Sequence, residues 1–238
     1  MEDIEREREK RGKTMRFHYR AGQHLLKVTV PSYQHERICG KLSVYAVHKI
    51  FQMGLTPKDF ILAGSTTYRG TGSGDSSGSG EGDSAFVPQA RFHNGKSWPT
   101  FVLEAGDSQS LEGLRNDMRW WFAASQHEVK IVLVAKLYPA TREIRLEKYV
   151  KDVSHVRTGA TCTRNTPQLQ PRPTQVVTIA PREANPGQEL QFTVVGAPLI
   201  LDFQLLFLRA PNLDAGESDL EYTSSDLEDT ASAVWSSD

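Results

Sequence analysis

The fold is decided by one stretch of the chain, residues 99–137, with the sequence PTFVLEAGDSQSLEGLRNDMRWWFAASQHEVKIVLVAKL. Near its start, Phe101, Leu103 and Ala105 share one face, and this period of two predicts a strand. Its end, 129–137, is almost entirely apolar, which is typical of a strand in the centre of a sheet. A helix is predicted between the two strands, because five large apolar side chains fall on one helical face. These are Leu111, Leu114, Met118, Trp121 and Phe122.

Further elements are predicted on both sides of this stretch. A helix is expected over 33–53, where apolar residues recur at helical spacing after Ser32, a suitable N-cap residue. Short apolar or alternating runs predict strands at 27–30, 60–68, 83–88, 144–150, 175–179, 190–195 and 199–208. This mixture of helices and strands predicts an α/β or α+β fold, in which helices flank a mixed β-sheet.

The composition changes along the chain and predicts five parts. These are a charged N-terminal tail (1–26), a core (27–151), a Pro-containing linker (152–174), a β-strand extension (175–211) and an acidic C-terminal segment (212–238). Within the core, 69–82 has six Gly and four Ser, and no Gly-Lys-Ser/Thr sequence closes it as in a phosphate-binding loop. We therefore predict a flexible surface linker there. In the last segment, Ser225–Glu228 matches a capping box and predicts a short docked helix.

Composition and charge limit the class of protein. No apolar run reaches the roughly 18 residues of a membrane span, and the charged start lacks the apolar stretch of a secretory signal. Two cysteines, Cys39 and Cys162, are too few for a disulfide framework, so we expect an intracellular protein, nuclear or cytoplasmic, without a membrane partner. The net charge is −1, but residues 212–238 hold eight acidic residues and no Lys or Arg. The rest of the chain is therefore moderately basic, and DNA or RNA stays open as a partner.

Three carboxylates at the ends of predicted elements carry the candidate chemistry. Glu104 stands in an otherwise apolar strand, where an ionised carboxylate is costly unless it is paired, hydrogen-bonded or bound to a metal. Asp83 opens the preceding strand, and Glu36 lies in the first turn of the leading helix. Such oxygen ligands suit Mg²⁺ or Mn²⁺ in phosphodiester chemistry. The structural alternatives are a favourable helix-dipole position for Glu36 and a plain turn for Asp83.

Four basic residues are candidates for a group that contacts an anionic substrate. Arg115 borders the apolar stripe of its predicted helix, so its side chain can point along the sheet; Arg119 follows one turn later. Lys130 and Lys136 stand at the two ends of the apolar strand. The alternatives are ion pairs within the helix for the arginines and solvent-facing strand ends for the lysines. Cys39 is expected to be a packed thiol, and no pair of His residues has a metal-ligand spacing.

Four segments carry a resemblance to known proteins. They are DSAFVP (83–88), WPTFVLEAGDS (98–108), the helical residues 111–121 and VKIVLV (129–134). Over about 32–150 the chain resembles a group of uncharacterised fungal proteins, which are similar, more remotely, to the PD-(D/E)XK nuclease superfamily of restriction-endonuclease-like folds. The resemblance implies a nuclease-like core that cuts nucleic acid with Mg²⁺, followed here by a C-terminal β extension and a short terminal helix.

The resemblance also implies roles for individual residues. Asp83 matches the motif aspartate, Glu104 the Asp/Glu of the third element, and Glu36 the acid of the leading helix. Gly106 stands where the motif has lysine, and Arg115 is the natural substitute. A guanidinium neutralises charge but is a poor proton donor. The implied activity is a Mg²⁺- or Mn²⁺-dependent endonuclease. Its rival is a degenerate nuclease fold that serves as a binding or scaffolding module of undetermined oligomeric state.

Overall fold

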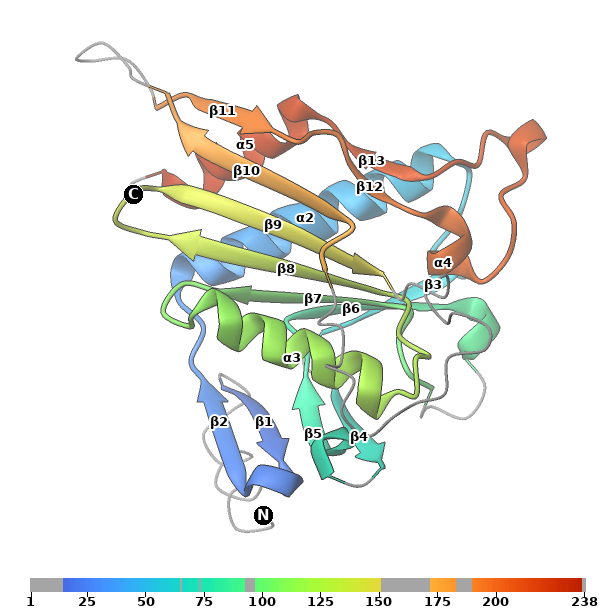
Figure 1. Ribbon diagram of the computed structural model, residues 1–238. Helices are drawn as coiled ribbons and strands as arrows, with labels where there is room; N and C mark the ends of the chain where they lie inside the picture. The colour runs from blue at the N-terminus through green and yellow to red at the C-terminus, as the bar shows by residue number, and fades with distance from the viewer. Residues whose placement is uncertain are drawn as a thin grey trace, which may run out of the picture.

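The centre of the molecule is a seven-stranded sheet with the order β11-β10-β9-β8-β7-β6-β3 (Figure 1). The computed structural model describes residues 15–64, 66–72, 74–92, 97–150, 172–182 and 190–236. The strands of the sheet are β3 (Phe60–Ala63), β6 (Ser84–Pro88), β7 (Phe101–Gly106), β8 (Ile131–Tyr138), β9 (Glu143–Val150), β10 (Gln175–Pro181) and β11 (Phe192–Val195). β7 and β8 are parallel and every other neighbouring pair is antiparallel, which confirms the predicted mixed sheet.

Helices cover both faces of this sheet (Figure 1). α2 (Tyr33–Gln52) and α5 (Ser224–Trp235) lie on one face, and α3 (Leu111–Ala124), which connects the parallel strands, lies on the other. Both long helices begin where the sequence indicates: the Ser32 side chain accepts from the His35 amide, and the Ser110 side chain accepts from the Gly113 amide. Because strand side chains alternate, Leu103 joins the core under α2 whereas Val102 joins the core under α3.

A smaller antiparallel sheet packs against α3. Its order is β2 (Leu25–Thr29), β1 (Arg16–Arg20), β5 (Ser77–Glu81) and β4 (Thr67–Thr71). Two predictions are therefore wrong: the Gly/Ser stretch 69–82 is largely strand, and the end of the predicted tail 1–26 forms a hairpin. Glycine permits this packing, because a Cβ on Gly80 would lie 2.4 Å from the Trp120 ring.

The C-terminal region also departs from two predictions. The alternating stretch 199–208 divides into β12 (Leu199–Leu201), which pairs with β13 (Leu220–Tyr222), and the short helix α4 (Phe203–Phe207). In α4, Phe203, Leu206 and Phe207 are buried at helical spacing. The apolar residues that predicted a strand by their alternation are therefore equally compatible with a helix. The capping box of α5 uses Thr223 and Asp226 rather than Ser225 and Glu228.

The acidic C-terminal segment is part of the core. The terminal helix is confirmed: α5 buries Leu227, Ala231, Val234 and Trp235, and it packs on α2. Its acids pair with α2, since Lys49 Nζ lies 2.7 Å from Asp226 Oδ2 and Lys41 Nζ lies 2.7 Å from Asp229 Oδ2. Among the described helices, none combines the length and hydrophobicity required to cross a bilayer. Most of the predicted linker 152–174 and residues 1–14 lie outside the described residues.

Candidate functional site

Asp83 and Glu104 lie side by side on neighbouring strands. The Asp83 amide donates to the Leu103 carbonyl at 3.0 Å, and its Oδ2 accepts from the Ala105 amide at 2.7 Å. These two bonds fix the Asp83 carboxylate against the backbone that bears Glu104. Both acids are buried, with 8% and 3% of their surfaces exposed. The pairing of β6 with β7 therefore places Asp83, the residue before β6, next to Glu104 in the neighbouring strand.

The surroundings of Glu104 disfavour its charge on balance. Its side chain lies on the α3 face, where Trp121 Nε1 donates to Oε1 at 2.5 Å and His18 Nε2 lies 3.6 Å from the same oxygen. Burial raises the pKa of Glu104 well above its ordinary value, and the neighbouring carboxylates of Asp83 and Asp117 raise it further. Among the described residues, neither Lys nor Arg forms an ion pair with Glu104.

Asp117, on α3, is a third buried acid that sequence reasoning missed. Its Oδ1 lies 2.7 Å from Arg20 NH2, and its Oδ2 binds the Lys27 ammonium and accepts from Gln109 Nε2 at 2.8 Å. Asp117 is 4% exposed. We call Asp83, Glu104 and Asp117 the carboxylate cluster. A signal was present in the sequence, because Asp117 lies between Leu114 and Trp121 on the apolar side of its helix.

The β1–β2 hairpin places cationic side chains over the carboxylate cluster. Arg16 Nε lies 2.9 Å from Asp83 Oδ1, and Arg16 NH1 lies 3.2 Å from Glu36 Oε1. Glu36 therefore reaches the cluster through Arg16 and not directly; its side chain is 56% exposed. Arg20 and Lys27 bind Asp117 in the same way. The segment predicted as a tail thus supplies much of the positive charge at the site.

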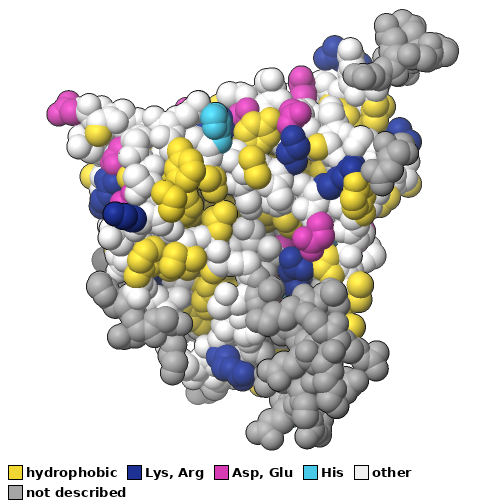
Figure 2. Space-filling view, turned by 180° about the vertical axis from the view of Figure 1, so that it is seen from behind, with side chains coloured by type: hydrophobic (Ala, Val, Ile, Leu, Met, Phe, Trp, Pro, Cys, Tyr) yellow, Lys and Arg dark blue, Asp and Glu magenta, His cyan; other side chains and the backbone are white. Residues whose placement is uncertain are grey.

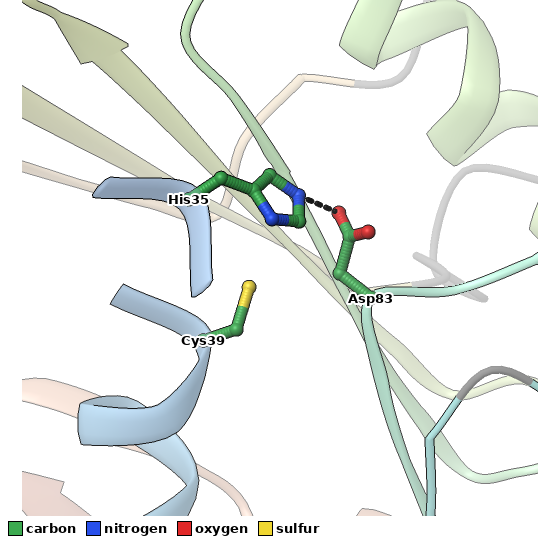
Figure 3. A group of neighbouring side chains, drawn as sticks. All are labelled: His35, Cys39 and Asp83. Carbon is green, nitrogen blue, oxygen red and sulfur yellow. Dashed lines mark ion pairs between the residues drawn. The ribbon is translucent and has the colours of Figure 1, made fainter. Parts of the chain in front are cut away.

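Two histidines complete the surroundings of the cluster. Burial, together with the charge of Lys27, lowers the pKa of His18 to about 4, so this imidazole is neutral near pH 7. Its Nε2 donates to the Glu81 carbonyl at 2.8 Å, and its Nδ1 accepts from Arg20 at 3.3 Å. His35 Nε2 lies 3.0 Å from Asp83 Oδ2 (Figure 3). Burial lowers the pKa of His35, but the Asp83 carboxylate outweighs it and holds that pKa above its ordinary value.

Arg115 is held away from the predicted role by another acid. Its Nε lies 3.0 Å from Glu147 Oε2 and its NH2 lies 2.8 Å from Glu147 Oε1, a two-pronged pair to which Tyr149 and Arg145 also bind. Burial alone would raise the pKa of Glu147, but hydrogen bonds from Arg115, Tyr149 and Arg145 lower it to about 2. Because both prongs of its guanidinium hold Glu147, Arg115 serves the structure of the sheet in this arrangement.

The other basic candidates have local partners, and one of them stands in a notable position. Arg119 binds Glu112 at 2.8 Å, and Lys130 Nζ donates to the His127 carbonyl at 2.8 Å. Lys136 is directly opposite Gly106 in the parallel pairing of β7 with β8, on the same face as Glu104. Its ammonium donates to the Asp107 carbonyl. Gly106, which occupies the position of lysine in the motif that the chain resembles, therefore pairs with a lysine on the neighbouring strand.

The comparisons with known proteins include a distant likeness to a solved structure. No protein-family model and no curated protein matches the chain, so the fungal resemblance stays a prediction. A solved structure from Anabaena variabilis, described as a "putative nuclease belonging to DUF820", is similar with a TM-score of 0.45 and 10% identity, covering 90% of each chain.

Proposed function

We propose that this chain is a metal-dependent phosphodiesterase of nuclease-like fold that acts on nucleic acid, with Asp83 and Glu104 as ligands of Mg²⁺ or Mn²⁺. The observation that carries the proposal is the carboxylate cluster itself. Asp83, Glu104 and Asp117 are all buried, the charges of Asp83 and Asp117 raise the pKa of Glu104, and among the described residues Glu104 forms no ion pair with Lys or Arg. A buried carboxylate beside two others is stabilised by a divalent cation.

The donor chemistry of the site fits such an ion. Asp83 and Glu104 both offer carboxylate oxygens, the donors that Mg²⁺ and Mn²⁺ prefer. Arg16 would compete with the metal ion for Asp83, because its guanidinium already contacts Asp83 Oδ1. Bound there, a divalent ion would neutralise phosphate charge and lower the pKa of a bound water.

The chain's own residues have supporting roles in this proposal. The Ala105 amide and Trp121 Nε1 fix the orientations of the Asp83 and Glu104 carboxylates. Arg16, released from Asp83, would lie beside an anionic substrate, and Lys136 occupies the row of the motif lysine. Arg115 is not needed for this chemistry, since Glu147 holds its guanidinium. Glu36 assists by binding Arg16.

Nucleic acid is proposed as the substrate because a metal site of this kind suits a phosphodiester and because the chain outside 212–238 is moderately basic. On the face shown in Figure 2, the Lys and Arg side chains of the described residues alternate with Asp and Glu and form no continuous basic stripe. We therefore expect the contact with nucleic acid on another face, near the carboxylate cluster and the β1–β2 hairpin.

A second candidate function has its own observation. Gly106 stands at the motif's lysine position, and Arg16 and Lys27 already neutralise two of the three acids. These features favour a degenerate nuclease fold that binds nucleic acid or protein without cutting it.

One pair of assays separates the two candidates. Nicking of supercoiled plasmid is measured with Mg²⁺, with Mn²⁺ and with EDTA, for wild type, Glu104→Gln and Asp83→Asn. Glu112→Gln is the matched control, because Glu112 is an exposed acid on α3 that pairs with Arg119. Metal-dependent nicking that only Glu104→Gln and Asp83→Asn abolish supports the enzyme. Nicking that survives both substitutions contradicts it. Salt-dependent binding of a labelled duplex without nicking supports the second candidate.

A further inference from the structure

A second group of potential metal ligands lies on the α2 side of Asp83. His35 and Cys39 are one helical turn apart, so their side chains project from the same face of α2 toward Asp83, directly before β6 (Figure 3). One ligand atom from each of His35, Cys39 and Asp83 lies within 4.8 Å of the other two. All three residues are buried. An imidazole, a thiol and a carboxylate therefore converge on one small volume.

The histidine of this group lacks the hydrogen bonds that a buried imidazole normally has. His35 is 1% exposed, and neither Nδ1 nor Nε2 has a hydrogen-bond partner in the described structure. Nε2 lies 3.0 Å from Asp83 Oδ2, but this contact does not have hydrogen-bond alignment. An unsatisfied buried polar group destabilises the fold. A metal ion that accepts the imidazole lone pair would remove that cost.

The geometry and charge of the group fit a four-coordinate ion. Zinc bonds to N, O and S of about 2.0–2.3 Å place the donors roughly 3.5 Å apart. His35 Nε2 and Asp83 Oδ2, at 3.0 Å, would therefore have to separate slightly, and the donors of the other pairs lie within 4.8 Å of each other. A thiolate and a carboxylate together carry two negative charges, which balance a divalent ion in a buried site. The thiol proton of Cys39 passes to solvent on binding. Asp83 can serve this group through Oδ2, because Arg16 contacts Oδ1.

We propose that His35, Cys39 and Asp83 form a binding site for Zn²⁺ or a similar borderline transition metal. The mixed N, S and O donors select Zn²⁺ over Mg²⁺, which prefers oxygen alone. Three protein ligands leave one position for water or a substrate oxygen. The site goes beyond the proposed phosphodiesterase, because it requires neither Glu104 nor cleavage of nucleic acid; the two share only Asp83.

Optical spectroscopy of the cobalt-substituted full chain tests this site. After treatment with chelator, the protein is titrated with Co²⁺ near neutral pH. We expect one equivalent to produce a sulfur-to-cobalt charge-transfer band in the near ultraviolet and visible bands of tetrahedral cobalt. Added Zn²⁺ should remove both sets of bands. A wild-type titration without a charge-transfer band overturns the proposal.

Variants assign the ligands. Cys39→Ser should abolish the charge-transfer band, whereas Cys162→Ser, which alters the chain's other thiol, should leave it intact. The opposite pattern overturns the proposal. Circular dichroism checks folding; if Cys39→Ser unfolds, His35→Gln replaces it and should weaken Zn²⁺ binding by at least about 100-fold, since even outer-shell partners are worth 10–100-fold. An unchanged Zn²⁺ affinity in His35→Gln overturns the site as well.

A further variant separates this site from the phosphodiesterase. Glu104→Gln should keep the full cobalt spectrum, because Glu104 is not one of the three ligands, although it abolishes the proposed nicking. Loss of the spectrum in Glu104→Gln would place the metal in the carboxylate cluster and overturn the separate site. Absence of nicking with an intact cobalt spectrum would contradict only the phosphodiesterase.

Discussion

Glu104 and Glu147 are two buried glutamates in one row of the same sheet, and their surroundings are opposite. Val134 pairs with Glu104 on one side and with Glu147 on the other, so both carboxylates project from the α3 face. They are 3% and 0% exposed. Arg115, Arg145 and Tyr149 lower the pKa of Glu147 to about 2, whereas burial and neighbouring acids raise that of Glu104 well above normal.

The difference shows that burial alone does not indicate function. Glu147 has its positive partners within the chain, so its charge contributes to folding. For Glu104, burial and the charges of Asp83 and Asp117 outweigh the hydrogen bond from Trp121, so its charge opposes folding unless a cation is added. In the proposed function, Glu104 and not Glu147 therefore binds the metal.

The largest expected effect is on stability at Glu147. Glu147→Gln should lower the free energy of unfolding by about 3 kcal/mol, because it removes the partner of two arginines from a buried ion pair. Glu104→Gln should leave stability unchanged or raise it, since glutamine still accepts from Trp121 and no longer repels Asp83. Urea unfolding near neutral pH measures both. Equal losses in the two variants would contradict the comparison.

Addition of metal should act on one of the two glutamates. Mn²⁺ or Mg²⁺ should raise the melting temperature of wild type, because a ligand at 100 times its Kd stabilises the native state by about 2.7 kcal/mol. Glu104→Gln should lose most of this response. Glu147→Gln should melt at a lower temperature than wild type without metal but should show the same rise on addition of metal. This variant is therefore the control. A response that Glu104→Gln retains would place the ion elsewhere.

The dependence of stability on pH should have opposite signs for the two positions, measured with EDTA present. Glu104 has a raised pKa in the native state, so its destabilising charge develops as pH rises above the ordinary glutamate value. The stability of Glu104→Gln relative to wild type should therefore increase with pH. Glu147 has a lowered pKa, so its contribution is present above the ordinary value and is lost as pH falls toward 2. Parallel profiles for the two variants would refute this assignment.

A smaller effect is expected at Arg115. Arg115→Lys keeps the charge but loses the two-pronged bond to Glu147, and we expect a loss of about 1–2 kcal/mol of stability. The response to Mn²⁺ should not change, because Arg115 is not near the metal in this interpretation. Loss of metal-dependent nicking in a folded Arg115→Lys variant would restore the role predicted from the sequence.

The smallest effect is expected at Glu36. Its side chain is 56% exposed and touches the site through Arg16. Glu36→Gln should therefore change the free energy of unfolding by less than about 1 kcal/mol. We expect the affinity of the Glu36→Gln variant for Mn²⁺, measured by titration calorimetry, to be only slightly lower than that of wild type. A loss as large as that of Glu104→Gln would make Glu36 a direct ligand.

Much of the fold could be predicted because its central elements have clear periodicity. Residues 33–53, 99–105, 111–122 and 129–137 satisfy a period of 3.6 or 2 or form one apolar run, and the structure has a helix or strand in each. The adjacency of Asp83 and Glu104 was predictable from consecutive strands. By contrast, β4 (TYRGT) and the serine- and glycine-rich β5 (SGSGE) lack apolar alternation, and both contact α3.

The rest of the site depends on contacts that are distant in sequence. Arg16, His18 and Arg20 alternate along β1, a pattern visible in the sequence RFHYR, but nothing local shows that this face covers buried acids. Likewise, the register of β8 with β9 determines that Glu147 faces Arg115, 32 residues earlier. Helical spacing places His35 beside Cys39, but Asp83 joins them only through the packing of α2 on β6.

The pairing of Gly106 with Lys136 has a consequence for how such proteins are recognised. A linear motif describes the order of residues along one strand, whereas a substrate meets the surface made by several strands. Neighbouring strands are about 4.8 Å apart, so a lysine can change strands and still present its ammonium to the same face. In the proposed function, Lys136 therefore supplies from β8 the charge that the motif places two residues after the acid of β7, and the order of residues along β7 alone does not show it.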